Sequence, residues 1–301
     1  MTAPATTPTA TRPATRSTET ELTGPKFFTP RVGHALAWVA ALIVAVLWLL
    51  PMLWTIDTSL KPESETTIYP PEWIPTRFTI EAYTAVLAQG DVLVWFGNSV
   101  IVAVAVTVMT VITSAWAGYA FSRLPFKGMN ILYAITIAGI IVPGNVLVVP
   151  LFQEMLTLRM VDTYWGIILP QVVAPAMVFI LKKFFDALPK ELEEAALVDG
   201  ASRWRIFWQI VMPLSRPILA AVSIFTFIGA WNNFFWPFLV TSDPNLMTLP
   251  VGLANVQSSY GLRYAQIMAA AVIAALPLVV VFLFFQRQII RGVATAGLGG
   301  N

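Results

Sequence analysis

The sequence predicts an all-α integral membrane protein with six transmembrane helices. Hydrophobic residues make up 57% of the 301 residues and charged residues only 11%, whereas a soluble globular domain carries about 25% charged residues. The mean hydropathy is +0.73. A chain with so few charges cannot cover its own surface in water, so most of its surface is expected to face lipid.

Six long intervals without a charged residue predict the six spans. Each has about 19 residues or more, and a helix needs about 20 residues to cross the hydrocarbon layer of a membrane. Helices are required there because lipid offers no partner for backbone polar groups. The predicted spans are the interval from His34 to Ile56, then Val92–Ser122, Gly128–Gln153, Thr163–Leu181, Pro217–Ser242 and Tyr264–Gln286.

The basic residues predict the orientation of these spans. If both termini are cytoplasmic, only Lys61, Arg77, Arg159 and Arg263 of the 18 Lys and Arg residues lie outside the cell. Cytoplasmic loops carry an excess of Lys and Arg, so this arrangement is the expected one. We therefore expect a multi-pass protein of the cytoplasmic membrane with both ends inside.

Two tails flank the six-span domain, which we place at residues 31–292. Residues 1–30 are rich in Thr, Pro and Ala and are expected to form a disordered cytoplasmic tail. Ala35–Ile56 is interpreted as a retained anchor, because no clear small-residue cleavage site accompanies it. Residues 293–301 form a Gly-rich cytoplasmic tail.

Several functional classes are disfavoured by what the sequence lacks. No Asp, Glu, Lys or Arg lies deep in a predicted span, whereas ion-coupled carriers place ionisable groups there. No phosphate-binding loop of the Gly-x4-Gly-Lys-Ser/Thr kind is present, so the chain is not expected to hydrolyse ATP. The single histidine and absent cysteines predict no metal or cofactor site, and a net charge of +2 argues against binding nucleic acid.

The most charged stretch, residues 186–216, lies in the cytoplasmic loop between the fourth and fifth predicted spans. Its segment Glu191–Pro213 predicts a short helix, a turn at Gly200 and a second helix capped by Ser202. One apolar edge of the first helix is expected to comprise Leu188, Leu192, Ala195 and Ala196. Such a helix pair suits a groove on another protein, although periodicity alone fits an ordinary interfacial loop equally well.

Motif spacing distinguishes these two interpretations. Glu194-Ala195-Ala196, three residues, Gly200, nine residues and then Ile210 to Pro213 resemble the EAA motif of bacterial ABC-importer permeases, with Met212 in place of the usual Leu. The resemblance implies a permease core with coupling helices, on which two ATP-binding subunits dock. It also implies a homologous second permease and an extracytoplasmic solute-binding protein as partners, with ATP and Mg²⁺ used only by the ATP-binding subunits.

Further segments are similar to the MalG-type subunits of maltose transporters. They are residues 118–128, 151–170, 188–201 and 231–240. This resemblance implies import of a carbohydrate, a disaccharide or oligosaccharide, by alternating access. Permeases for polyols, glycerol phosphate or another polar solute remain alternatives, as does the separate class of ion-coupled secondary transporters.

Candidate solute contacts come from polar and aromatic residues within the predicted spans. Sugars are recognised by hydrogen bonds to hydroxyls and by aromatic faces. In a continuous fifth span, residues 232 and 236 would share one face of the helix. The same residues also suit helix–helix bonding or the membrane interface. The candidates are Trp231, Asn232, Asn233, Trp236 and, in the third predicted span, Asn145.

Overall fold

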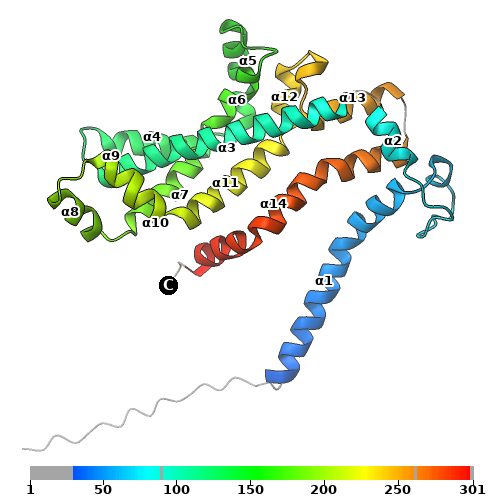
Figure 1. Cartoon of the computed structure of the whole chain (residues 1–301), viewed down its shortest axis with the longest axis horizontal. Coiled ribbons are helices and arrows are strands. Elements are labelled where there is room, and N and C mark those ends of the chain that lie inside the picture. The colour runs from blue at the N-terminus through cyan, green and yellow to red at the C-terminus, as the bar shows by residue number, and fades with distance from the viewer. Residues whose placement is uncertain (1–29, 89–90, 261–262, 299–301) are drawn as a thin grey trace, which may run out of the picture. The chain divides into compact units, whose positions relative to one another are not determined.

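The computed structural model describes residues 30–88, 91–260 and 263–298, and within them it is helical with no β-strand (Figure 1). The chain divides into two compact units, Met1–Met52 and Leu53–Asn301. The predicted disordered tail lies outside the described residues except for Pro30, where α1 begins. The last helix continues through residues 293–298, so the described part of the predicted C-terminal tail is helical.

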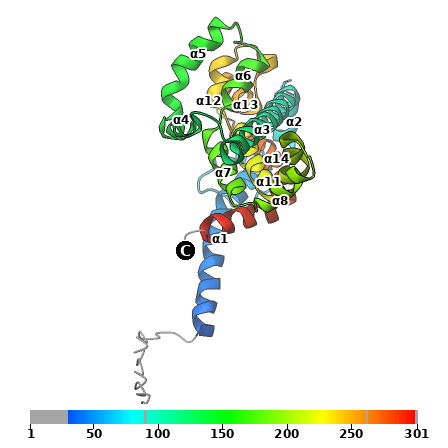
Figure 2. The ribbon, with the colours of Figure 1, turned by 90° about the vertical axis from the view of Figure 1, so that its left-hand side faces the viewer.

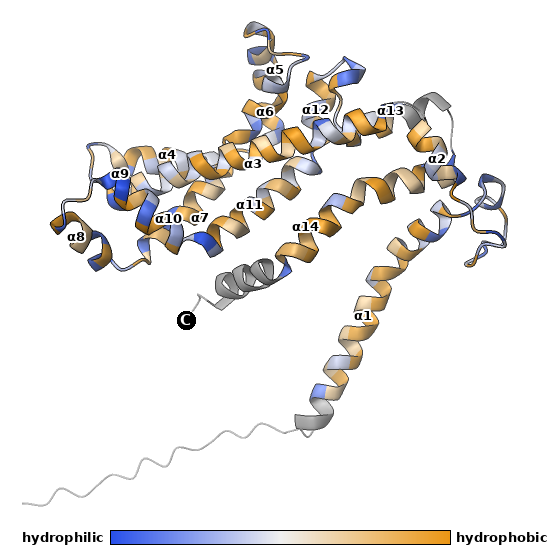
Figure 3. Ribbon diagram, in the orientation of Figure 1, coloured by the Kyte–Doolittle hydropathy of each residue, from blue (hydrophilic) through white to orange (hydrophobic). Residues whose placement is uncertain are grey.

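Within the part of the chain that the structure describes, three helices are long and apolar enough to cross a membrane by themselves. They are α1 (Pro30–Ser59), α3 (Val92–Arg123) and α14 (Tyr264–Leu298), whose apolar part is Tyr264–Gln286. Their apolar residues stand out in Figure 3, whereas polar residues gather at α9 and in the loop between α1 and α2. These helices confirm the first, second and sixth predicted spans.

The other three predicted spans are not continuous helices, which corrects the sequence-based prediction. The third divides into α4 (Met129–Ile141) and α5 (Val148–Thr157), joined by η2 (Gly144–Leu147) and bent by 98°. The fourth divides into α6 (Tyr164–Val172) and α7 (Pro175–Asp186), bent by 46°.

The fifth predicted span contains α11 (Arg216–Trp231) and then, after a break, α12 (Phe235–Val240). Prolines account for all three breaks. Pro143 and Pro175 disfavour a helical conformation in the residue before each of them. Pro237 lacks an N–H group, and its ring would clash with the carbonyl of Asn233 in a continuous helix.

Short helices connect these elements. At one end of α3, between the fourth and fifth predicted spans, α8 is followed by a second helical stretch, Arg203–Leu214, that contains a π-helical segment. At the other end are two short helices that the sequence analysis did not predict, α2 and α13. The connecting elements are η1 (Glu63–Glu65), α2 (Glu81–Ala88), α8 (Glu191–Val198), α9 (Arg203–Ile206), η3 (Phe207–Val211), α10 (Met212–Leu214), η4 (Pro244–Leu246) and α13 (Leu249–Tyr260).

Within the unit Leu53–Asn301, helix α3 is the central element. Figures 1 and 2 show α7 and α11 beside it, and both pack against it over much of its length. A Cβ added at Gly118 of α3 would lie 3.1 Å from the backbone nitrogen of Lys182 in α7, so these two helices are in close contact. One core cluster surrounds Val102, Ile167 and Trp231, and a second surrounds Tyr119, Phe185 and Phe207 near α8.

Candidate functional site

The segment Glu191–Pro213 forms the predicted helix, turn and second helix. Gly200 follows α8 with φ +77°, a left-handed conformation that glycine adopts without strain. The hydroxyl of Ser202 accepts a hydrogen bond from the backbone N–H of Arg205 at 3.3 Å, which caps the second helix. The local structure predicted for this segment is confirmed. We refer to Glu191–Pro213 as the docking segment, after the role that the motif resemblance implies.

The motif residues of the docking segment divide into two groups. Ala196 and Ile210 are partly buried and pack against the second core cluster, so they hold the segment to the rest of the chain. Met212, at the position of the usual Leu, packs against the same cluster, whereas the other motif residues are exposed, and they are Glu194, Ala195, Gly200 and Pro213.

The apolar edge predicted for α8 is corrected by the structure. Leu188 and Ala196 pack inward, whereas Leu192 and Ala195 are exposed, and Val198 is 88% exposed. Leu192, Ala195 and Val198 recur at three-residue intervals, so they lie close together on the outer surface of α8. An apolar surface on this short, otherwise polar helix is therefore exposed to solvent. Such a surface is typical of a contact with another protein.

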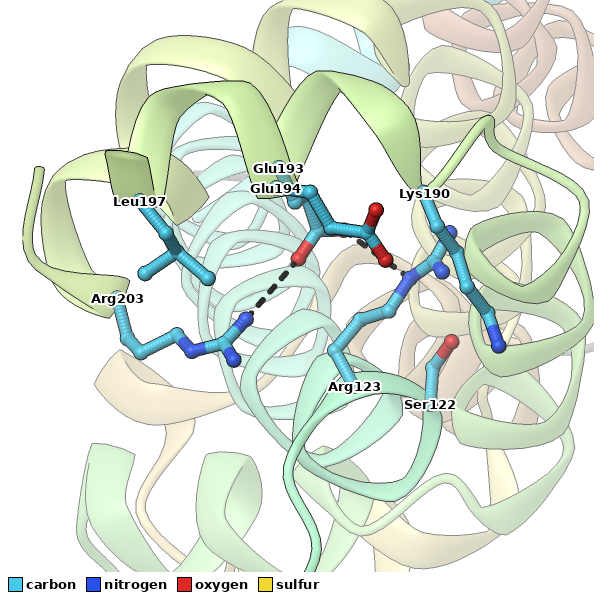
Figure 4. Close-up of a pocket in the computed structure, with 7 residues that line it drawn as sticks. All are labelled: Ser122, Arg123, Lys190, Glu193, Glu194, Leu197 and Arg203. Carbon is cyan, nitrogen blue, oxygen red and sulfur yellow. Dashed lines mark ion pairs between the residues drawn. The ribbon is translucent and has the colours of Figure 1, made fainter. Parts of the chain in front are cut away.

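The inward side of α8 carries a buried charge that the sequence analysis did not single out. Glu193 is 5% exposed and is the only buried residue of α8 among those that the structure describes. Its carboxylate pairs with Arg123 of α3 at 3.0 Å and with Arg203 of α9 at 3.6 Å (Figure 4). The hydroxyl of Tyr119 donates a hydrogen bond to the same carboxylate at 3.3 Å.

Arg123 also bonds the end of another helix. Its Nη2 donates to the carbonyl oxygens of Phe185 at 2.5 Å and Leu188 at 2.7 Å. Carbonyls at the C-terminal end of a helix lack intrahelical donors, so a cation there is favourable. One side chain of α3 thus bonds both the end of α7 and the acid on α8. No local signal in the sequence identifies this cluster, because Arg123 and Glu193 are 70 residues apart.

A pocket of about 200 Å³ lies beside this cluster. Figure 4 shows Glu193 between the two guanidinium groups, with Lys190 and Ser122 on the side of Arg123. Both acidic and basic groups line the pocket. Among the described residues, no three His, Asp or Glu side chains are grouped as a metal site requires.

A second polar region lies where two of the broken spans meet. Asn233, in the break between α11 and α12, donates from Nδ2 to Oε1 of Gln171 in α6 at 2.7 Å. Trp236 donates from its indole nitrogen to the carbonyl of Gly166 at 3.0 Å. At the end of α6, directly before the α6–α7 break, Thr110 of α3 donates to the carbonyl of Val172 at 3.2 Å. Non-helical backbone at membrane depth is tolerated where protein covers it or where it lines a water-filled cavity.

The predicted solute candidates have different environments in this region. Trp231 is 2% exposed, and its indole nitrogen donates to the carbonyl of Ala274 at 3.1 Å, so it belongs to the core. Trp236 is also buried. Asn232 is exposed, and Asn233 is partly buried.

The predicted common face of residues 232 and 236 is wrong, because α11 ends at Trp231 and α12 begins at Phe235. Asn145 is exposed, and it lies in η2 at the break between α4 and α5, not in a continuous transmembrane helix. Gln171, which the structure joins to Asn233, is not among the solute candidates predicted from the sequence.

Similarity to known proteins extends over most of the chain. Residues 110–295 match the family model described as "Binding-protein-dependent transport system inner membrane component". The arabinooligosaccharides transport system permease protein AraQ of Halalkalibacterium halodurans is 34% identical over 275 residues, which are 88% of this chain and 97% of that protein. The trehalose/maltose transport system permease protein MalG of Thermococcus litoralis is 37% identical over 269 residues, 87% of this chain and 96% of that protein.

Among solved structures, one chain from a bacterial ABC transporter involved in the import of the acidic polysaccharide alginate has a similar fold. The TM-score is 0.78 at 21% identity, with 87% of this chain and 99% of that chain covered. At this identity the similarity concerns the fold alone, and it agrees with the helical architecture predicted from the sequence.

Proposed function

The chain belongs to the family of binding-protein-dependent transport system inner membrane components, and we propose that it is a permease for a carbohydrate, a disaccharide or oligosaccharide. As a permease of an ABC importer, it works with other subunits. In this proposal a homologous second permease completes the pathway, two ATP-binding subunits dock on the cytoplasmic side, and a solute-binding protein delivers the sugar from outside. ATP and Mg²⁺ bind to the ATP-binding subunits, and this chain performs no catalysis itself.

The exposed apolar surface of α8 is the observation that carries the coupling part of this proposal. Leu192, Ala195 and Val198 lose their contact with water when a partner covers them. The docking segment is cytoplasmic in the orientation that the basic residues predict, which also leaves both termini inside. Closure of the ATP-binding subunits then moves α8, and the pathway changes from inward-facing to outward-facing.

The amide groups at the helix breaks support the carbohydrate part. Gln171 and Asn233 are already hydrogen-bonded to each other, and the adjacent Asn232 is exposed. Neutral amides donate to and accept from hydroxyl groups, so they suit sugars. A glycerol phosphate needs a cation for its phosphate group, and these three side chains are uncharged. A carbohydrate is therefore favoured over the phosphorylated alternative.

Replacement of Gly200 tests the docking assignment. Gly200→Val places a β-branched residue at φ +77°, whereas Gly200→Asn places there a residue that tolerates this conformation. A Cβ at this position would meet open space, so both variants fit sterically and differ mainly in backbone strain. In proteoliposomes that contain the complete transporter, we expect Gly200→Val to lose binding of the ATP-binding subunits and sugar uptake, and Gly200→Asn to keep both. Normal uptake by Gly200→Val would contradict the assignment.

The solute path is tested separately at the helix breaks. Asn233→Ala removes the bond to Gln171, and Asn232→Ala removes an exposed amide beside it. We expect each variant to raise the KM for uptake of a labelled oligosaccharide while the ATP-binding subunits still bind. Asn130→Ala, at an exposed position in α4, is the matched control. Uptake kinetics identical to the control for both variants would remove these residues from the solute path.

A further inference from the structure

Helix α8 has few direct links to the membrane-spanning helices. Its backbone packs mainly against α9, and turns at residues 187–190 and 199–202 join it to its neighbours. Of its own side chains, Glu193 is buried and Ala196 is partly buried, and the other six are exposed. A helix attached in this way would rotate about the turns at its two ends unless an inward-facing contact prevented the rotation.

Glu193 of α8 contacts the ends of α3 and α7, two helices that are closely joined to each other. Gly118 brings α3 and α7 into close contact, and Arg123 bonds the carbonyls of Phe185 and Leu188 at the end of α7. The Nε of the same guanidinium pairs with Glu193 at 3.0 Å, and both side chains are no more than 7% exposed. Glu193 therefore connects α8 to the joined ends of α3 and α7 through a contact from which water is largely excluded.

The chemistry of this contact makes it stiff. Arg123 and Arg203 lie on two sides of one carboxylate, and Tyr119 donates a further hydrogen bond to it. A buried carboxylate that leaves these partners would be uncompensated, so α8 cannot shift alone without a large penalty. Removal of the negative charge weakens the contact, because the two guanidinium groups then repel each other across an uncharged side chain.

We propose that the Arg123–Glu193–Arg203 cluster transmits movement of the docking helix to α3 and α7. Glu193 and Arg123 act as positioning residues: they make α8 and the ends of both helices move together, so that the turns beside α8 do not absorb the movement. This role rests on the proposed function, in which the ATP-binding subunits dock on the outer surface of α8. The cluster itself faces inward and is not part of that outer surface.

Glu193→Gln tests the role in the complete transporter, reconstituted in proteoliposomes. Gln has nearly the same volume as Glu but no charge. ATP hydrolysis and sugar uptake are measured in the same vesicles, and binding of the ATP-binding subunits is measured by co-purification. We expect binding to be retained and hydrolysis to continue, while the sugar imported per ATP hydrolysed falls about tenfold, within the range typical of coupling between sites.

Asp186→Asn is the matched control. Asp186 also carries a charge at the end of α7, where it pairs with Lys182 at 2.8 Å and accepts a hydrogen bond from Ser122 of α3 at 2.7 Å. It is more exposed than Glu193 and has no contact with α8 among these bonds, so its replacement should leave the ratio of uptake to hydrolysis unchanged. Arg203→Gln keeps the inner pair intact and should lower the ratio by a smaller factor than Glu193→Gln.

Three outcomes would overturn the proposal. The first is an unchanged ratio in Glu193→Gln, and the second is an equal fall in the control Asp186→Asn. The third is loss of subunit binding by Glu193→Gln, which would place the cluster in the docking contact. If Glu193→Gln does not fold, Arg203→Gln decides the question by the same ratio. Failure of the docking assignment is distinguishable, because it appears as normal subunit binding and uptake in Gly200→Val.

Discussion

Replacement of Asn98 by Ala should destabilise the chain through three lost hydrogen bonds. Asn98 is a buried residue of α3 whose Nδ2 donates to the carbonyls of Asn245 at 2.7 Å and Met247 at 2.9 Å. Its Oδ1 accepts from the hydroxyl of Tyr164 at 2.6 Å. Side-chain hydrogen bonds in membrane proteins contribute about 0.6 kcal/mol each, so three contribute about 2 kcal/mol. The acceptors and the hydroxyl left unpaired raise the expected loss to about 3 kcal/mol.

The free energy of unfolding is measured by denaturant titration of the purified chain in detergent. Asn130→Ala, an Asn replacement at an exposed position of α4, should change it by less than about 0.5 kcal/mol. A double-mutant cycle of Asn98→Ala with Tyr164→Phe isolates one of the three bonds and should give a coupling energy of about 0.6 kcal/mol. If Asn98→Ala is as stable as the control, these three hydrogen bonds do not stabilise the fold. If the cycle is additive, the bond between Asn98 and Tyr164 contributes nothing.

The remaining predictions concern two tightly packed positions. A Cβ at Gly166 would overlap the carbonyl oxygen of Met160 and lie 2.9 Å from the carbonyl carbon, so Gly166→Ala should cost about 1 to 3 kcal/mol in the same titration. Gly144→Ala, which meets no atom within 4 Å, should cost much less, and an equal loss in both would refute the steric argument. Lys61 is buried, pairs with Asp57 at 2.6 Å and donates from Nζ to the carbonyl of Glu72 at 2.5 Å. Lys61→Met leaves the carboxylate unpaired and removes the bond to the loop, so it should speed proteolysis of residues 62–80. Addition of Asp57→Asn to Lys61→Met should restore part of the resistance to proteolysis. A cleavage rate in Lys61→Met equal to that of the wild type would show that Lys61 does not hold this loop.

Local patterns predicted much of the fold and of the docking segment. The six apolar intervals identified the membrane-crossing regions because charge is excluded from lipid over the full length of a span. Gly200 and Ser202 were assigned correctly because a helix end and a helix cap depend on neighbouring residues alone. The motif spacing depends only on the chain, so the family was recognisable before any contact was known.

The helix breaks could be predicted only in part from the sequence. Proline disfavours helix locally, but neighbouring helices decide whether a span bends or continues, since they supply partners for the freed backbone groups. Thr110 on α3 supplies one such partner to Val172 beside the α6–α7 break. The break after Trp231 moved Trp236 away from the face it was predicted to share with Asn232, and the fold joined Asn233 to Gln171 instead.

Hydropathy, basic residues and motif spacing are properties of short stretches, so the amino-acid sequence alone identifies this chain as a membrane permease of an ATP-driven importer and predicts that its partners dock at Glu191–Pro213. Which side of α8 faces outward, and what its inner side contacts, depends on the packing of distant helices. In the sequence, Glu193 and Glu194 are adjacent acids with the same chemistry. The packing of α3 places Arg123 beside the first and leaves the second exposed, since burial of a charge depends on a partner brought from 70 residues away.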